Sequence, residues 1–140
     1  MPVHAIAYVS QLVPGLGRDE IDELVRDAAA HNSMAGVTGV LLCDGAVFLQ
    51  YLEGPADGVA SAYRRIRNAT SHFEVMELGR AMTGARRFPF WSMHWIPVDQ
   101  SDLAEATRAE WAALVQSHHP ASQRATGVDK LRQLVAPHLN

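Results

Sequence analysis

The stretch 32–54 constrains the fold most, because it predicts a β-hairpin that carries a side-chain amide near each end. Residues 37–43 and 46–53 form two apolar runs, and the Asp44-Gly45 pair between them is typical of a two-residue hairpin turn. Gln50 lies inside the second run among apolar neighbours. A buried amide is costly unless partners satisfy its hydrogen bonds. The fold is therefore expected to offer Gln50 a polar partner.

The predicted turn also fixes which residues face each other across the hairpin. It places Gln50 opposite Gly39, and Leu41 opposite Phe48. By alternation, Gln50 shares a face with Leu41, Phe48 and Leu52. Gln50 is therefore predicted to point into the protein rather than toward water.

Other apolar patterns predict the remaining elements of the chain. They indicate strands at 3–9, 73–78 and 91–98, helices at 18–32 and from Pro55, and two helices after Ser101 that are separated by a break at 118–123. This order predicts an α+β fold, a ferredoxin-like βαββαββ sandwich with two extra C-terminal helices. Right-handed connections would place the first two helices on one face of a single sheet. The last two helices are then available to cover the other face.

The first strand is predicted to be central, because both of its faces are apolar. In a sandwich of this kind it lies beside the third strand, which brings Tyr8 within reach of Gln50. The inward stripe of the first helix becomes small at Ala28 and polar at His31 and Asn32. These observations predict a slot above Tyr8 and Gln50, with two helices as its walls.

Length and charge set the outer bounds on function. A chain of 140 residues suffices for one domain, and its net charge of -3 gives no sign of a nucleic-acid or membrane partner. The longest apolar runs fall short of the roughly 20 residues of a membrane span, and the N terminus has the pattern of a strand rather than a signal peptide. The single cysteine, Cys43, excludes an intrachain disulfide and favours a cytoplasmic location. His118 and His119 lack the partners of a metal site, so no metal is expected.

The chain resembles the BLUF domains, a family of flavin-binding blue-light sensors. The resemblance covers residues 3–98 and rests on four blocks: Tyr8 with Ser10, HNSMAGVTG from His31, FLQYLEG from Phe48, and RRFPFWSM from Arg86. It implies a photosensor domain at 1–98 and a C-terminal two-helix extension at 99–140 that packs on the sheet. The chain is similar to the short type of the family, which has no fused output domain.

The resemblance assigns the photochemistry to two residues. Tyr8 matches the tyrosine that donates an electron and a proton to the excited flavin. Gln50 matches the glutamine between that tyrosine and the flavin's C4 carbonyl and N5 edge, whose amide rearranges after excitation. The residue types suit these roles, because a phenol can donate both particles and an amide can exchange donor for acceptor.

Four further residues match positions around the flavin. Asn32 matches the asparagine that hydrogen-bonds the carbonyl and imide edge of the ring, and His31 stands where a ring-flanking residue is usual. Arg65 and His72 match positions near the ring and its ribityl-phosphate tail. The resemblance therefore implies a cofactor-binding set of Tyr8, His31, Asn32, Gln50, Arg65, His72 and Met93.

Trp91 and Met93 match the strand whose movement near the glutamine is thought to relay the signal. Alternation along strand 91–98 predicts that both side chains lie on one face of the sheet. The signal would pass to a response protein of unknown identity or within a homo-oligomer, because an exposed sheet edge and the C-terminal helices offer surfaces for assembly.

The main hypothesis is a photoreceptor rather than an enzyme, with FAD (or FMN or riboflavin) bound non-covalently. Two positions depart from the family pattern, since Ala69 and Ser71 stand where an aspartate and an arginine are usual. They motivate an alternative, a BLUF-like interaction module that has lost flavin binding. A third possibility is a small enzyme on the same scaffold, which no nucleophile, carboxylate pair or metal set supports.

Overall fold

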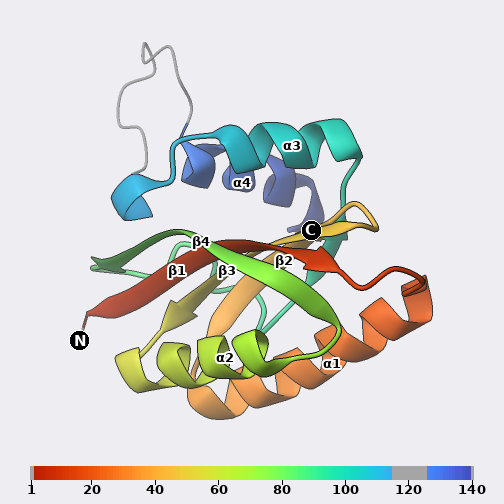
Figure 1. Cartoon of the computed structure of the whole chain (residues 1–140). Helices are drawn as coiled ribbons and strands as arrows, with labels where there is room; N and C mark the ends of the chain where they lie inside the picture. The colour runs from red at the N-terminus through yellow and green to blue at the C-terminus, as the bar shows by residue number, and fades with distance from the viewer. Residues whose placement is uncertain (1, 115–125, 140) are drawn as a thin grey trace.

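A single five-stranded sheet with a helical layer on each face forms the protein (Figure 1). The computed structural model describes residues 2–114 and 126–139. The strands are β1 (Val3–Leu12), β2 (Thr38–Cys43), β3 (Val47–Gly54), β4 (His72–Thr83) and β5 (Trp95–Pro97), in the spatial order β4-β1-β3-β2-β5. β5 runs parallel to β2, and the other neighbouring strands are antiparallel. β1 therefore lies inside the sheet and beside β3, as predicted.

The helices divide between the two faces of the sheet (Figure 1). Helices α1 (Arg18–Ala35) and α2 (Ala56–Asn68) cover one face, while α3 (Gln100–Arg108) and α4 (Gly127–Val135) cover the other. A short 3-10 turn, η1 (Ala112–Leu114), lies between α3 and α4 in the chain, and a second, η2 (Ala136–His138), follows α4. This arrangement confirms the α+β sandwich. The predicted break at 118–123 lies outside the described residues.

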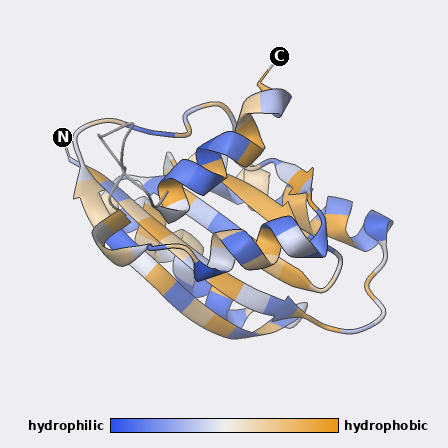
Figure 2. Cartoon of the chain, turned by 90° about the horizontal axis from the view of Figure 1, so that it is seen from above, coloured by the Kyte–Doolittle hydropathy of each residue, from blue (hydrophilic) through white to orange (hydrophobic). Residues whose placement is uncertain are grey.

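Each face of the sheet packs its own hydrophobic core. Along β1, Ala5 and Ala7 belong to the core beneath α3 and α4, while Ile6 and Tyr8 belong to the core beneath α1 and α2. Figure 2 shows strands that are mainly hydrophobic, whereas the helices and one long strand carry both hydrophobic and hydrophilic positions. The double-sided burial of β1 confirms the prediction made from its sequence. Among the described residues, no helix has the length and apolar character to cross a membrane.

The hairpin forms as predicted, but its register is shifted by two residues. Gln50 lies opposite Leu41, not Gly39. The cause is Asp44, whose carboxylate accepts hydrogen bonds from the backbone N–H groups of Ala46 and Val47, each at 2.8 Å. Asp44 therefore begins the turn instead of occupying its centre. Because a shift of two preserves the alternation, Gln50 still faces α1 and α2.

The last strand is shorter than the predicted 91–98, and this changes the direction of two side chains. The backbone N–H of Gly39 donates to the Trp91 carbonyl at 3.0 Å, and that of Leu41 donates to the His94 carbonyl at 2.9 Å. Between these bonds β2 advances two residues and its partner advances three, so regular alternation fails. Met93 enters the core beneath α1 and α2, whereas Trp91 packs against the opposite core. The prediction that Trp91 and Met93 share a face is wrong.

Three other elements extend beyond their predicted bounds. β1 reaches Leu12 instead of residue 9, because β4 is also longer than 73–78 and pairs along it. α1 continues to Ala35 and ends at Gly36, which adopts a left-handed conformation with φ of 73°. Gly36 thus supplies the helix stop, three residues later than the predicted end at 32.

A close approach of α2 to the end of α1 requires a glycine at position 58. A Cβ atom on Gly58 would lie 2.2 Å from the backbone oxygen of Ala35, and Gly58 is buried. Backbone atoms cannot yield as a flexible side chain can. The spacing of the two helices that cover one face of the sheet therefore depends on this residue.

Gly58→Ala is expected to lower the free energy of unfolding by about 1–3 kcal/mol through overpacking. This loss should outweigh the gain of up to ~1 kcal/mol that alanine brings to an ordinary helix position. Gly84→Ala is the control, because nothing lies within 4 Å of a Cβ atom there. Urea unfolding of both variants measures the difference. Equal stability of the two would contradict the close approach.

Candidate functional site

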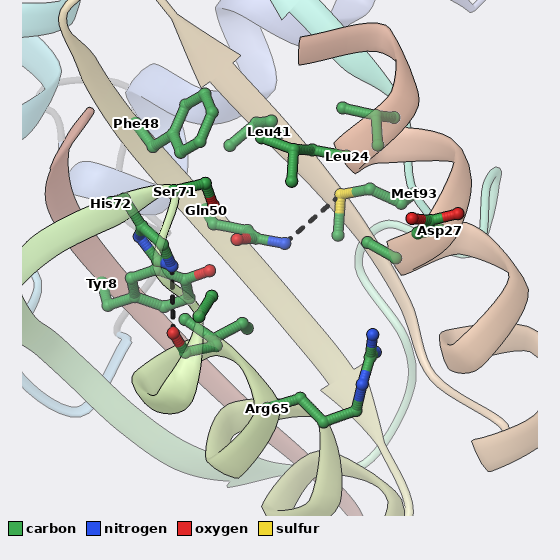
Figure 3. A pocket seen from close by; sticks show the side chains of 14 residues that line it. Tyr8, Leu24, Asp27, Leu41, Phe48, Gln50, Arg65, Ser71, His72 and Met93 are labelled. Atoms are coloured by element: carbon green, nitrogen blue, oxygen red, sulfur yellow. Dashed lines mark hydrogen bonds between the residues drawn. The ribbon is translucent and has the colours of Figure 1, made fainter. Parts of the chain in front are cut away.

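A cavity of about 170 Å³ lies over the centre of the sheet, between α1 and α2 (Figure 3). Residues from every strand of the sheet except β5, and from both helices, line it. They are Tyr8, Leu24, Val25, Asp27, Ala28, Leu41, Phe48, Gln50, Arg65, Ile66, Ala69, Ser71, His72 and Met93. The cavity occupies the position predicted for the slot.

Tyr8 contributes a buried hydroxyl that has no hydrogen-bond partner among the described residues. The side chain is 0% exposed and lies directly opposite Gln50 in the pairing of β1 with β3. Burial, with a smaller contribution from nearby Tyr63, raises the pKa of Tyr8 well above its ordinary value. The phenol therefore keeps its proton near neutral pH. An unpaired buried donor of this kind is costly, which indicates that an acceptor belongs in the cavity.

Gln50 contributes an amide that is held by a weak partner. Its Nε2 atom donates to the thioether sulfur of Met93 at 3.5 Å, and the contact is buried (Figure 3). A thioether is a weak acceptor. The Gln50 amide can therefore exchange this contact for a stronger one at little cost.

His72 forms one wall of the cavity and is fixed at both ring nitrogens. Its Nε2 atom lies 3.0 Å from the Ile66 carbonyl, and its Nδ1 atom lies 2.7 Å from the Ser10 hydroxyl. Because a carbonyl can only accept, Nε2 carries the proton and Ser10 donates to Nδ1. Burial lowers the pKa of His72, and the bond to Ile66 opposes this in part. His72 is therefore a neutral side chain that ties β1, α2 and β4 together.

The mouth of the cavity carries one cation and one anion. Arg65 extends from α2, and Asp27 lies on α1 across from it (Figure 3). Arg65 is exposed, so its guanidinium group can reach an anionic group at the rim. Asp27 and Leu24 are lining residues that the sequence did not single out, although Leu24 lies on the predicted inward stripe of the first helix.

Three predicted site residues do not line the cavity. His31 is exposed on α1. Asn32 is buried at 3% exposure, and its Nδ2 atom donates to the Ser92 carbonyl at 2.8 Å. Trp91 stacks on His94, with ring centroids 4.3 Å apart and an interplanar angle of 24°. Asn32 thus holds the segment before β5. The predicted roles of His31 and Asn32 at the flavin, and of Trp91 in signal relay, stay predictions.

The lining residues fit a flat heteroaromatic ring with a polar edge. The floor offers a phenol that no described residue accepts a hydrogen bond from and an amide with a weak acceptor, and the rest of the lining is mainly apolar. A flavin presents carbonyl and imide groups that could satisfy both. Within the described residues, no cluster of three or more His, Cys, Asp or Glu side chains could hold a metal ion. His118 and His119 lie outside those residues.

The fold and the cavity thus define a small α+β domain whose floor suits a polar aromatic cofactor. The family model of BLUF, described as sensors of blue-light using FAD, matches residues 3–94. The chain belongs to the BLUF family of flavin-binding blue-light sensors.

Individual proteins and solved structures are also similar to this chain. The photoactivated adenylate cyclase subunit beta of Euglena gracilis is 33% identical over 84 residues, which cover 60% of this chain and 10% of that protein. The structure of BlrB, a BLUF protein in its dark state, matches 99% of this chain and 98% of its own with a TM-score of 0.76. At 24% identity, that likeness shows the fold alone. Klebsiella pneumoniae BlrP1 with FMN and cyclic diGMP matches 69% of this chain and 26% of its own, at 33% identity and a TM-score of 0.61.

The coverage limits what these relatives say about this chain. This chain spans about a tenth of the length of the first curated relatives that it matches, and about a quarter of the length of BlrP1. The similarity therefore concerns the sensor region of those proteins.

In flavin-free protein, Tyr8→Phe is expected to raise the free energy of unfolding by about 1 kcal/mol, because it removes a buried donor without a partner. Tyr51→Phe is the matched control on the opposite face of β3. Its hydroxyl donates to Glu53 at 3.1 Å, so its loss should lower stability by about 1–3 kcal/mol. Chemical denaturation compares the two. A loss of stability in Tyr8→Phe as large as in Tyr51→Phe would contradict an unpaired phenol.

The lowered pKa of His72 predicts that acid destabilises the protein. The pKa of His72 is near 6.5 in the unfolded chain and lower in the folded protein. Between these two pKa values the unfolded chain therefore binds more protons than the folded protein. The contribution of neutral His72 to the free energy of unfolding should therefore be fully present above pH 6.5 and should decrease as the pH falls below that value. His72→Gln should flatten this dependence, whereas His31→Gln at an exposed position should not. Urea unfolding at several pH values tests this, and an unchanged slope in His72→Gln would rule it out.

Proposed function

We propose that this chain senses blue light with a flavin, FAD in the first instance, bound non-covalently in the cavity between α1 and α2. The observation that carries the proposal is the Tyr8 hydroxyl, which lies opposite Gln50 in the sheet and has no hydrogen-bond partner in the described part of the chain. The family description names FAD as the cofactor. In this proposal residues 1–98 form the sensor and 99–140 form an extension on the far face of the sheet.

Several side chains would hold the cofactor. Tyr8 and Gln50 lie beneath the ring, Met93 and His72 flank it, and Arg65 at the rim suits the anionic tail. By their resemblance to the family, Asn32 would hydrogen-bond the polar edge of the ring and His31 would flank the ring. When bound, a flavin supplies the absorption of blue light and an electron acceptor.

Tyr8 acts as the donor in this mechanism. Burial keeps its hydroxyl protonated, so one residue can release an electron and a proton together. Because no described residue accepts its hydrogen bond, the hydroxyl is free to turn toward Gln50 or the ring. The neighbouring amide is then the group that responds.

Gln50 acts as the switch. Rotation of its amide exchanges an N–H donor for a carbonyl acceptor, which changes the hydrogen bonds on either side of it. Rotation also breaks the contact to Met93. Met93 belongs to the segment that Asn32 and β2 hold through the carbonyls of Ser92 and Trp91. A change at one amide therefore reaches a segment that joins the two faces of the sheet.

The signal passes to a response protein or to a second copy of the chain in this proposal. β4 is an edge strand of 12 residues that exposes Phe73, Met76 and Met82 at 46%, 56% and 67%. An apolar edge of this length favours association. A homo-oligomer and a cytoplasmic location stay predictions.

Two observations bear on which flavin the cavity binds and on whether it binds one. The BlrP1 structure holds FMN, which makes FMN a rival to FAD. Ala69 and Ser71 line the cavity without charge, where the family usually has an aspartate and an arginine. They support the second candidate, an interaction module without flavin. Titration of the folded protein with FAD and with FMN distinguishes a flavin-binding sensor from an interaction module, because an interaction module would bind neither flavin.

The absorption spectrum of the flavin-loaded protein, taken before and after blue light, tests the proposal. A small red shift that recovers in darkness is expected for the wild type. Gln50→Leu and Tyr8→Phe should bind flavin but lose the shift, since each removes one of the two reacting groups. Gln11→Leu, a glutamine change at an exposed position of β1, is the control and should retain it. A normal shift in both Gln50→Leu and Tyr8→Phe would reject these roles.

A further inference from the structure

Glu53 is a buried carboxylate on the face of β3 opposite to Gln50. It is 0% exposed, and Tyr51 on the same face lies in the core beneath α3 and α4. Its Oε1 atom accepts hydrogen bonds from the backbone N–H of Arg87 at 3.0 Å and from the Tyr51 hydroxyl at 3.1 Å. Its Oε2 atom accepts from the backbone N–H of Phe88 at 2.6 Å. Both oxygens are therefore engaged, by three donors.

A charge buried to this extent persists only where hydrogen bonds replace water. Two of the three donors are backbone groups of one short turn, residues 86–88. That turn is consequently fixed to β3 by a charge-assisted pair of bonds, which is a stronger attachment than packing alone. The burial of Glu53 and the position of the turn depend on each other.

The same turn is attached to two other parts of the protein. The Arg86 guanidinium donates to the Thr38 hydroxyl at 2.9 Å and to the Gly36 carbonyl at 2.6 Å, at the entrance to β2. The Arg87 guanidinium donates to the Leu114 carbonyl of η1 at 2.5 Å. Residues 86–88 thus join the central sheet to the layer that contains η1 and α4.

Phe88 reinforces this junction from the side of α4. Its ring lies 5.0 Å from that of Tyr51 in an edge-on arrangement, and the Arg132 guanidinium lies 5.9 Å from its centroid. Arg132 belongs to α4. A displacement of the turn would therefore disturb contacts of α4 as well as those of η1.

The turn is also the start of the segment that meets Gln50. Three residues after Phe88 comes Trp91, which packs against the core beneath α3 and α4, and two residues later Met93 contacts Gln50 on the other face. The segment is fixed again where β5 begins at Trp95. A displacement of Met93 therefore acts on two attachment points, the turn 86–88 and the start of β5.

We propose that Glu53 is a positioning residue, which fixes the turn 86–88 so that a change at Met93 is passed to η1 and α4 through Arg87 and Phe88. This inference rests on the proposed light response of Gln50. Glu53 touches neither the cavity nor the cofactor, and its effect is on the output rather than on the photochemistry. Without the fixed turn, the segment would absorb the motion and α4 would not respond.

Glu53→Gln is the most direct variant, because it keeps the size of the side chain. A glutamine amide has one acceptor oxygen, and its NH₂ group would oppose a backbone N–H donor. The variant should therefore release one end of the turn. Glu23→Gln, at an exposed position of α1, is the matched control.

The experiment compares flavin-loaded wild type, Glu53→Gln and Glu23→Gln in darkness and under blue light. The red shift should be retained in all three. Hydrogen exchange of the α4 amides should change with light in wild type and Glu23→Gln, and this change should be at least threefold smaller in Glu53→Gln. A wild-type response of α4 in a folded, photoactive Glu53→Gln would overturn the proposal, as would the absence of any light response of α4 in the wild type.

If Glu53→Gln does not fold, Tyr51→Phe serves as a second variant that tests the same proposal. It removes only the phenol donor, and should reduce the light response of α4 partially while leaving the red shift intact. An unreduced response in that variant would then count against Glu53. A wild type without any red shift would instead refute the proposed function, so the two failures are distinguishable.

Discussion

The pairing of β1 with β3 is the constraint on which the rest of the structure depends. It sets Tyr8 directly opposite Gln50 at the centre of a sheet that is covered on both faces. Apolar side chains on these strands keep the pair out of water, while the cavity above leaves the phenol without a partner among the residues that the structure describes. The core therefore stabilises an arrangement that costs free energy at one atom. A bound cofactor with polar edges would offset that cost by accepting the hydrogen bond of the phenol.

The two faces of the sheet perform different tasks. The face beneath α1 and α2 holds the cavity and Gln50, and the face beneath α3 and α4 holds Tyr51 and Glu53. β3 contributes to both, because its side chains alternate. The segment from Arg86 to His94 connects the faces by a different route, with Met93 on one side and Trp91 on the other. A response to light thus needs no large rearrangement of the sheet, since one irregular segment already contacts both layers.

Much of this could be predicted from the sequence, because periodicity encodes burial locally. The strands, the two-sided β1 and the neighbouring positions of Tyr8 and Gln50 follow from alternation and from the order of the elements. The register of the hairpin does not, because the Asp44 side chain selects the turn. The opposite directions of Trp91 and Met93 depend on one extra residue between two hydrogen bonds to β2. The bonds of Asn32 to Ser92 and of Glu53 to the turn 86–88 join residues far apart in the chain, which periodicity cannot reveal.

In the proposed mechanism, light changes the hydrogen bonds between Gln50 and a flavin held above it. The infrared difference spectrum of the flavin-loaded protein, light minus dark, tests this most directly. The stretching band of a ring carbonyl should move to lower wavenumber under blue light, because an amide N–H newly donates to that carbonyl, and it should return in darkness. A carbonyl band that keeps its position under blue light, in protein that has bound flavin, would contradict the account.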